Sequence, residues 1–159
     1  MKIIFLDIDG VLNNCYTEDA FGSYVFVEDE MLLLLKDLVD STDAQIVLSS
    51  SWRKGWFYRE NYPELENEDV WLFEALQSKL NENGIELYDY TEEIGVRENE
   101  ISLWLENNKN KEIESYVILD DFDEREFLAH INRLIQTDMS EGLTENHVQE
   151  AISILNNKQ

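Results

Sequence analysis

The chain has 159 residues, of which 43% are hydrophobic and 30% are charged, and this balance is typical of a globular protein rather than a disordered one. Its 35 acidic and 12 basic residues give a net charge of −23, which argues against non-specific binding to nucleic acid, because such binding requires Lys and Arg to neutralise phosphates. No apolar run approaches the roughly 20 residues of a membrane helix, so we expect no membrane contact. Simple solubility is the default interpretation of the acidic surface, and mimicry of nucleic acid or a basic protein partner is the alternative.

We expect residues 1–159 to form one domain, because this length suffices for one hydrophobic core and no linker or low-complexity tract divides it. Met1 and Lys2 lead directly into an apolar run, so nothing resembles a signal peptide and we expect a cytoplasmic location. Cys15 is the single cysteine and cannot form an internal disulfide, which fits a reducing compartment.

Strand-like and helix-like segments alternate along the chain. In chain order they are a strand at 3–6, an excursion at 13–27, a helix opening at 28–30, a strand at 44–48, a helix at 69–82, a strand at 85–88, a helix at 98–107, a strand at 116–119, a short helix at 123–130, a strand at 133–136 and a helix at 145–155. Residues 52–68 are aromatic, polar and irregular, with Pro63 inside, and we expect a loop there. This alternation predicts an α/β fold, a doubly wound, Rossmann-like parallel sheet of about five strands with helices on both faces.

Two acidic residues follow the first strand. Asp7 and Asp9 are two positions apart, so in extended chain their side chains point to the same side. Gly10 allows the backbone to turn sharply after them. Two neighbouring carboxylates repel each other, and a bound divalent cation is the usual relief. An open α/β sheet places its ligand at this end of a central strand.

The segment Asp7-Ile8-Asp9-Gly10-Val11 resembles DxDG(V/T), the first motif of the haloacid dehalogenase-like (HAD) phosphohydrolases. Ser49 follows an apolar run and resembles the second motif, a hydrophobic strand that ends in Ser or Thr. The sequence Ser-Ser-Ser-Trp-Arg over residues 49–53 is similar to an "SSxWR" pattern of the small HAD domains of RNA-repair ("Swiss Army Knife") proteins. Asp120 and Asp121 end another apolar strand and resemble the fourth motif.

The resemblance extends to residues 137–144, which are similar to a "TD…GLT" tail of the same small-domain family. It implies a phosphatase in which Asp7 attacks phosphorus to form an aspartyl-phosphate, while Asp9 acts first as general acid and then as general base. It also implies that Mg²⁺ is bound by Asp7, the backbone carbonyl of Asp9, Asp120 and Asp121.

The resemblance assigns phosphate binding to Ser49, with Ser50 beside it, and to Arg97, which precedes the expected helix at 98–107. A cation at this position would neutralise the nucleophile and the phosphoryl oxygens, although an exposed ion pair of Arg97 with Glu93 or Glu100 is an alternative. Arg53 either adds charge to the phosphate pocket or lies on the surface.

Remaining features bear on the substrate. The intervals between motifs hold only short insertions, so we expect a capless or minimally capped enzyme with an open site. The resemblance implies a polynucleotide-end phosphate. The net charge of −23 favours a nucleotide or sugar phosphate, or a polynucleotide end held by a partner subunit. A phosphotransferase, and a non-catalytic acidic HAD-fold protein that binds a basic partner, stay open as alternatives. His130 and His147 have no metal-ligand spacing and are interpreted as surface or packing residues.

Overall fold

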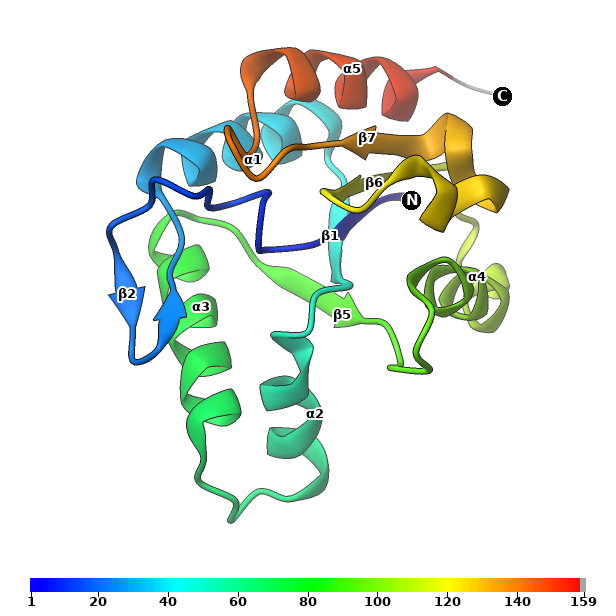
Figure 1. Cartoon of the computed structure of the whole chain (residues 1–159). Helices are drawn as coiled ribbons and strands as arrows, with labels where there is room; N and C mark the ends of the chain where they lie inside the picture. Colours follow the sequence, from blue (N-terminus) through cyan, green and yellow to red (C-terminus); the bar gives the residue numbers. More distant parts are fainter. Residues whose placement is uncertain (158–159) are drawn as a thin grey trace.

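The computed structural model describes residues 1–157, and its centre is a five-stranded sheet in the order β5-β4-β1-β6-β7 (Figure 1). All of its strand pairs are parallel, and β1 is the middle strand. The sheet strands are β1 (Lys2–Leu6), β4 (Gln45–Leu48), β5 (Leu87–Tyr90), β6 (Ser115–Asp120) and β7 (Leu134–Gln136). A separate antiparallel hairpin of β2 (Ala20–Phe21) and β3 (Tyr24–Val25) lies within the excursion after β1.

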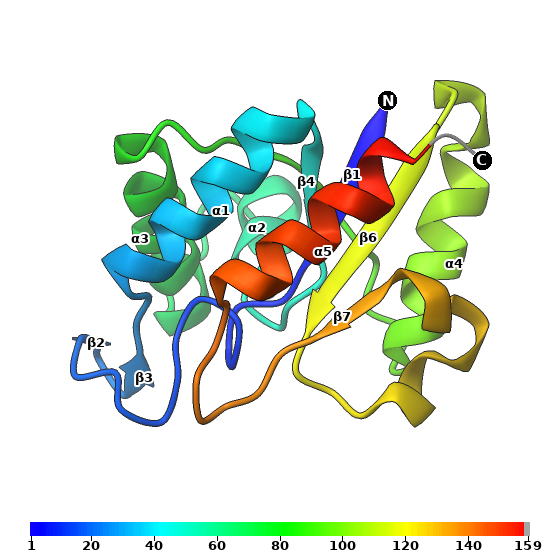
Figure 2. The same cartoon turned by 90° about the horizontal axis from the view of Figure 1, so that it is seen from above.

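Helices cover both faces of the sheet, as the sequence predicts. Figure 2 shows α1 and α5 side by side across one face, and α4 packs against the strand side chains of the other face. The helices are α1 (Asp29–Thr42), α2 (Arg53–Asn61), α3 (Glu68–Glu82), α4 (Arg97–Asn107), α5 (Glu145–Asn156) and the 3₁₀ segments η1 (Lys109–Lys111) and η2 (Glu124–Arg133). None of the helices described is long and apolar enough to cross a membrane.

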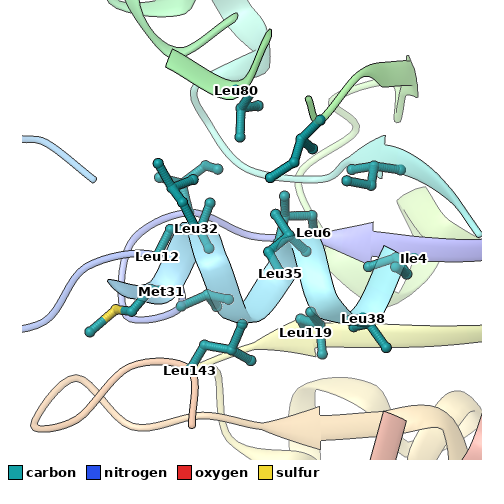
Figure 3. Close-up of a cluster of buried hydrophobic side chains, with 14 of the residues drawn as sticks. Ile4, Leu6, Leu12, Met31, Leu32, Leu35, Leu38, Leu80, Leu119 and Leu143 are labelled. Atoms are coloured by element: carbon teal, nitrogen blue, oxygen red, sulfur yellow. The ribbon is translucent and has the colours of Figure 1, made fainter. Parts of the chain in front are cut away.

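The hydrophobic core has two layers because successive side chains of a strand point to opposite faces. On β1, Ile4 and Leu6 pack against helices α1, α3 and α5, whereas Ile3 and Phe5 pack against α4 and η2. Figure 3 shows the first layer, in which Leu32, Leu35 and Leu38 of α1 lie over Ile4 and Leu6. Burial on both faces explains why the central strand reads as an uninterrupted apolar run.

The prediction of a loop over residues 52–68 is wrong in its first half, where α2 forms. This helix packs against α3, and Gly55 makes the close approach possible, because a Cβ atom there would lie 2.1 Å from the Asp69 carbonyl oxygen. Trp56 stacks on Phe73 of α3 with ring centroids 5.3 Å apart. The segment has aromatic side chains on several sides and no clear apolar stripe, so its helix depends on this tertiary packing.

Two other boundaries differ from expectation. The strand expected at 85–88 begins at Leu87, because Ile85 donates its N–H to the Leu80 carbonyl and closes the end of α3. The helix expected at 123–130 is instead a kinked 3₁₀ segment, with non-helical backbone at Phe127 and His130.

Candidate active site

Polar residues end three neighbouring strands at the same edge of the sheet. Asp7 follows β1, Ser49 follows β4, and Asp120 is the last residue of β6. Side chains two positions apart on a strand point to the same face of the sheet. Asp7, Ser49 and Asp120 therefore lie on the face that α4 covers, in line with the apolar side chains two positions before them. Arg97 is the first residue of α4 and meets them from that side.

Three carboxylates converge at this edge. Asp7, Asp120 and Asp121 each place one carboxylate oxygen within 4.8 Å of the others. Asp7 is 5% exposed and Asp120 is fully buried. The guanidinium of Arg97 lies 2.6 Å from Oδ2 of Asp120 and 3.5 Å from Oδ1 of Asp7. A single arginine therefore faces three carboxylates.

The electrostatics of the cluster favour an additional cation. The pKa of Asp7 is raised to about 7, chiefly by burial and then by the charge of Asp120, while Arg97 opposes both. Burial also raises the pKa of Asp120 and of Asp121. Oxygen-only ligands with excess negative charge suit a hard divalent ion such as Mg²⁺, so these residues fit the metal that the sequence predicts.

Gly10 and the segment 137–144 determine the shape of this site. Gly10 has φ +77°, and a Cβ atom there would lie 2.4 Å from Oδ2 of Asp121, so only glycine allows this carboxylate to approach. The hydroxyl of Thr137 donates to the Gly10 carbonyl over 2.7 Å, and the Leu143 N–H donates to the Val11 carbonyl over 2.8 Å. The "TD…GLT" segment thus holds the loop that carries Asp9.

The side chain of Asp9 is not part of the three-carboxylate group. Its Oδ1 accepts a hydrogen bond from the Asn13 amide at 3.0 Å, and its Oδ2 accepts one from the Trp52 indole at 3.1 Å. Trp52 is 3% exposed and stacks on Phe26. Both oxygens of Asp9 are therefore oriented by neutral donors. No sequence pattern indicated these roles of Asn13 and Trp52, since their contacts to Asp9 appear only in the folded chain.

The serines after β4 have different surroundings. Ser49 is fully buried, and its hydroxyl has no hydrogen-bond partner among the described residues. The hydroxyl of Ser50 accepts a hydrogen bond from the Trp52 N–H at 3.3 Å. An unpartnered buried hydroxyl is costly, and a ligand oxygen at this edge of the sheet would satisfy it.

Arg53 is buried, which excludes the surface location that the sequence left open. Its guanidinium donates to the carbonyls of Ser49 and Ser50 and pairs with Glu100 at 2.9 Å. It therefore supports the backbone of the serine turn.

Glu100, which the sequence suggested only as an exposed partner of Arg97, is 3% exposed and accepts hydrogen bonds from the N–H groups of Ile94 and Gly95. It thereby fixes the loop that leads to Arg97. The Arg97 side chain itself is 12% exposed and lies with Nε 3.8 Å from Glu100, so its ion pairs are largely buried.

The fold and the site together define an α/β protein that can bind a divalent cation and an oxyanion at the carboxyl edge of a parallel sheet. Residues 3–148 match the family described as the HAD domain in Swiss Army Knife RNA repair proteins. The match spans most of the chain, and the protein belongs to this family. Membership indicates chemistry of the phosphohydrolase type. Among curated proteins, none matches the chain significantly.

Proposed function

We propose that the protein is a Mg²⁺-dependent phosphatase that hydrolyses a phosphate monoester through an aspartyl-phosphate at Asp7. The observation that carries this proposal is the convergence of Asp7, Asp120, Asp121 and Arg97 beside the unpartnered hydroxyl of Ser49. Bound at the three carboxylates, Mg²⁺ would neutralise charge on the nucleophile and on the phosphoryl group.

In the first half-reaction, a carboxylate oxygen of Asp7 attacks phosphorus, and the bond from phosphorus to the leaving oxygen breaks. Asp9 donates its proton to that oxygen, so the leaving group departs as an alcohol. Arg97 and the Ser49 hydroxyl hold the transferring phosphoryl oxygens, with Ser50 in the same turn.

In the second half-reaction, Asp9 removes a proton from a water molecule that attacks the aspartyl-phosphate. The bond between Asp7 and phosphorus breaks, inorganic phosphate leaves, and Asp9 is again protonated for the next cycle. The hydrogen bonds from Asn13 and Trp52 keep the Asp9 carboxyl in one orientation through both steps.

For the substrate, we propose a nucleotide or a polynucleotide-end phosphate. The family description, which names RNA repair proteins, supports this class. The net charge of −23 disfavours contact with a long nucleic-acid backbone, so the phosphate of a short end or a free nucleotide fits better.

The test is release of p-nitrophenol from p-nitrophenyl phosphate by the wild type and by Asp7→Asn, each with Mg²⁺ and with EDTA. Turnover that needs Mg²⁺ and is lost in the variant is expected, followed by turnover of nucleotides or of oligonucleotides phosphorylated at a 3′ or 5′ end. If no ester is hydrolysed and Mg²⁺ fails to raise the melting temperature, the protein is instead a non-catalytic HAD-fold protein, and its acidic surface points to a basic partner.

A further inference from the structure

A pocket of about 950 Å³ lies beside the candidate active site, between α2 and the segment that joins β5 to α4. The helix α2 follows the carboxyl end of β4 and this segment follows that of β5 (Figure 1), and both strands run parallel to β1, which Asp7 follows. Arg53 lines the pocket and also donates to the carbonyls of Ser49 and Ser50. Through Arg53 the pocket adjoins the proposed phosphate-binding turn, and its volume suits a small molecule.

Aromatic rings form part of the wall of this pocket. Phe57, Tyr58 and Tyr90 line it, and Phe57 is 43% exposed. The ring of Tyr90 is held in place by Trp56, whose centroid is 5.0 Å away. Aromatic faces that are open to a pocket favour flat groups and, through their quadrupole, cations.

The charges of the pocket are unbalanced. Its basic residues are already engaged, because Arg53 pairs with Glu100 at 2.9 Å and Lys54 lies 3.9 Å from Glu93. Three further carboxylates line the pocket and have no cationic group within 4 Å in the described part of the chain; they belong to Glu60, Asp89 and Glu92.

Neutral donors satisfy two of these carboxylates without removing their charge. Glu60 accepts hydrogen bonds from the Trp56 indole and the Tyr90 hydroxyl. Asp89 accepts hydrogen bonds from the Trp104 indole and the Tyr90 N–H. The pocket thus carries uncompensated negative charge close to a site that must bind a phosphate dianion.

Two buried polar atoms in the wall also lack partners. Thr91 lines the pocket and is fully buried, and its hydroxyl has no hydrogen-bond partner within residues 1–157. The Nε of Arg53 is likewise unpartnered. Buried polar groups without partners are uncommon in folded proteins, and they indicate a polar ligand here independently of the acidic residues.

We propose that this pocket binds the leaving group of the phosphate ester and that this leaving group carries a protonated amine. The proposal rests on the proposed phosphatase activity, and it narrows the substrate to esters whose leaving group bears an amine. Within the nucleotide class proposed above, an amine-modified nucleotide meets this requirement. An ammonium group offsets the repulsion between the phosphate and the carboxylates of Glu60, Asp89 and Glu92, and it also interacts favourably with the aromatic faces. An amino sugar, an amino alcohol and an amine-modified nucleotide share this chemistry.

The first test compares kcat/KM for glucosamine 6-phosphate and glucose 6-phosphate, which differ by one amine in place of a hydroxyl. O-phosphoethanolamine represents the amino alcohols, and an amine-modified nucleotide is the third class of substrate tested. We expect kcat/KM to be at least about tenfold higher for the amino sugar ester. This is the size of effect expected from one partly desolvated ion pair together with a cation–π contact. The Glu92→Gln variant should lose most of this preference. Glu150→Gln, which removes an exposed charge on α5, is the matched control and should retain it.

The second test measures binding without turnover. Glucosamine and glucose are titrated into the wild type while intrinsic fluorescence is followed, since Trp56 lies against Tyr90 in the pocket wall. A saturable change in fluorescence with glucosamine, weaker with glucose, supports the assignment. This change should be reduced in Glu92→Gln and should persist in Asp7→Asn.

The two tests separate the two proposals. Equal kcat/KM for the paired esters together with equal binding of the paired sugars would overturn the amine assignment and leave the phosphatase intact. If the enzyme hydrolyses no ester but still binds glucosamine selectively, the phosphatase and the leaving-group role fail, whereas the amine site stands.

Discussion

Two groups of buried polar side chains lie on the α4-covered side of the sheet, and they are built differently. In the first, His130 lies between the Ser102 hydroxyl, 2.8 Å from its Nε2, and the Tyr116 hydroxyl, 2.8 Å from its Nδ1. Every hydrogen-bonding atom of this imidazole has a partner. The second group, around Asp7 and Asp120, has excess negative charge, and its Ser49 hydroxyl has no partner in the part of the chain that the structure describes.

Burial of polar groups has a different consequence for stability and for ligand binding in the two groups. A satisfied network stabilises the fold and offers nothing to a ligand. A cluster with like charges and an unpartnered donor costs stability when it is empty, and a bound cation and oxyanion recover that stability.

The largest effect is expected from Asp7→Asn. Removal of the nucleophile should lower kcat by at least about 10³-fold, while loss of one of three like charges should leave the melting temperature of the metal-free protein equal or higher. Turnover and thermal unfolding measure the two effects. Asp37→Asn, at an exposed position on α1, is the control, and a similar loss of activity there would contradict the assignment.

Ser49→Ala and Ser102→Ala form a matched pair. Loss of a hydroxyl that donates to a charged phosphoryl oxygen should lower kcat/KM by about 10- to 100-fold. The stability of the ligand-free protein should be equal or slightly higher, because this buried hydroxyl has no partner within residues 1–157. Loss of the Ser102 hydroxyl should instead destabilise the protein by about 1 kcal/mol and leave kcat/KM unchanged. Steady-state kinetics and denaturant unfolding of both variants decide this, and a reversed pattern would exchange the roles of the two groups.

Mg²⁺ should raise the melting temperature by several degrees at pH 7.5 and by less at pH 5. The pKa of Asp7 in the folded protein is raised from 3.8 to about 7, so the folded state binds this proton more tightly than the unfolded state does. The metal-free protein therefore loses stability as pH rises from about 3.8 to about 7. Mg²⁺ competes with that proton. Thermal unfolding with Mg²⁺ or EDTA measures this, and an equal shift at both pH values in wild type would refute the explanation.

His130 should give a smaller effect of opposite sign. Burial lowers the pKa of His130 from its ordinary value of 6.5, so its contribution to stability is present above that pH and is lost as pH falls below it. Between pH 7 and pH 5 the wild type should lose about 1 kcal/mol more than His130→Gln. Unfolding at constant Mg²⁺ concentration tests this, and the same dependence in both proteins would show that His130 does not contribute.

Much of the fold follows from local patterns. Apolar runs of strand length that alternate with helical segments predicted the parallel sheet with helices on both faces, and the structure and the family confirm it. The segment that became α2 was missed because its helix has no clear apolar stripe of its own and depends on Gly55 and Trp56 packing against α3.

The sequence by itself indicated where polar chemistry would gather, because Asp7, Ser49 and Asp120 each interrupt or follow an apolar strand, and parallel strands end at one edge. The side chains that complete the site could be identified only in the folded chain. The hydrogen bonds of Asp9 with Asn13 and Trp52 depend on how loops approach each other. The same holds for the burial of Arg53 against Glu100, residues 47 positions apart in the chain. Strand periodicity is local, but such contacts depend on the arrangement of distant segments, which no local pattern records.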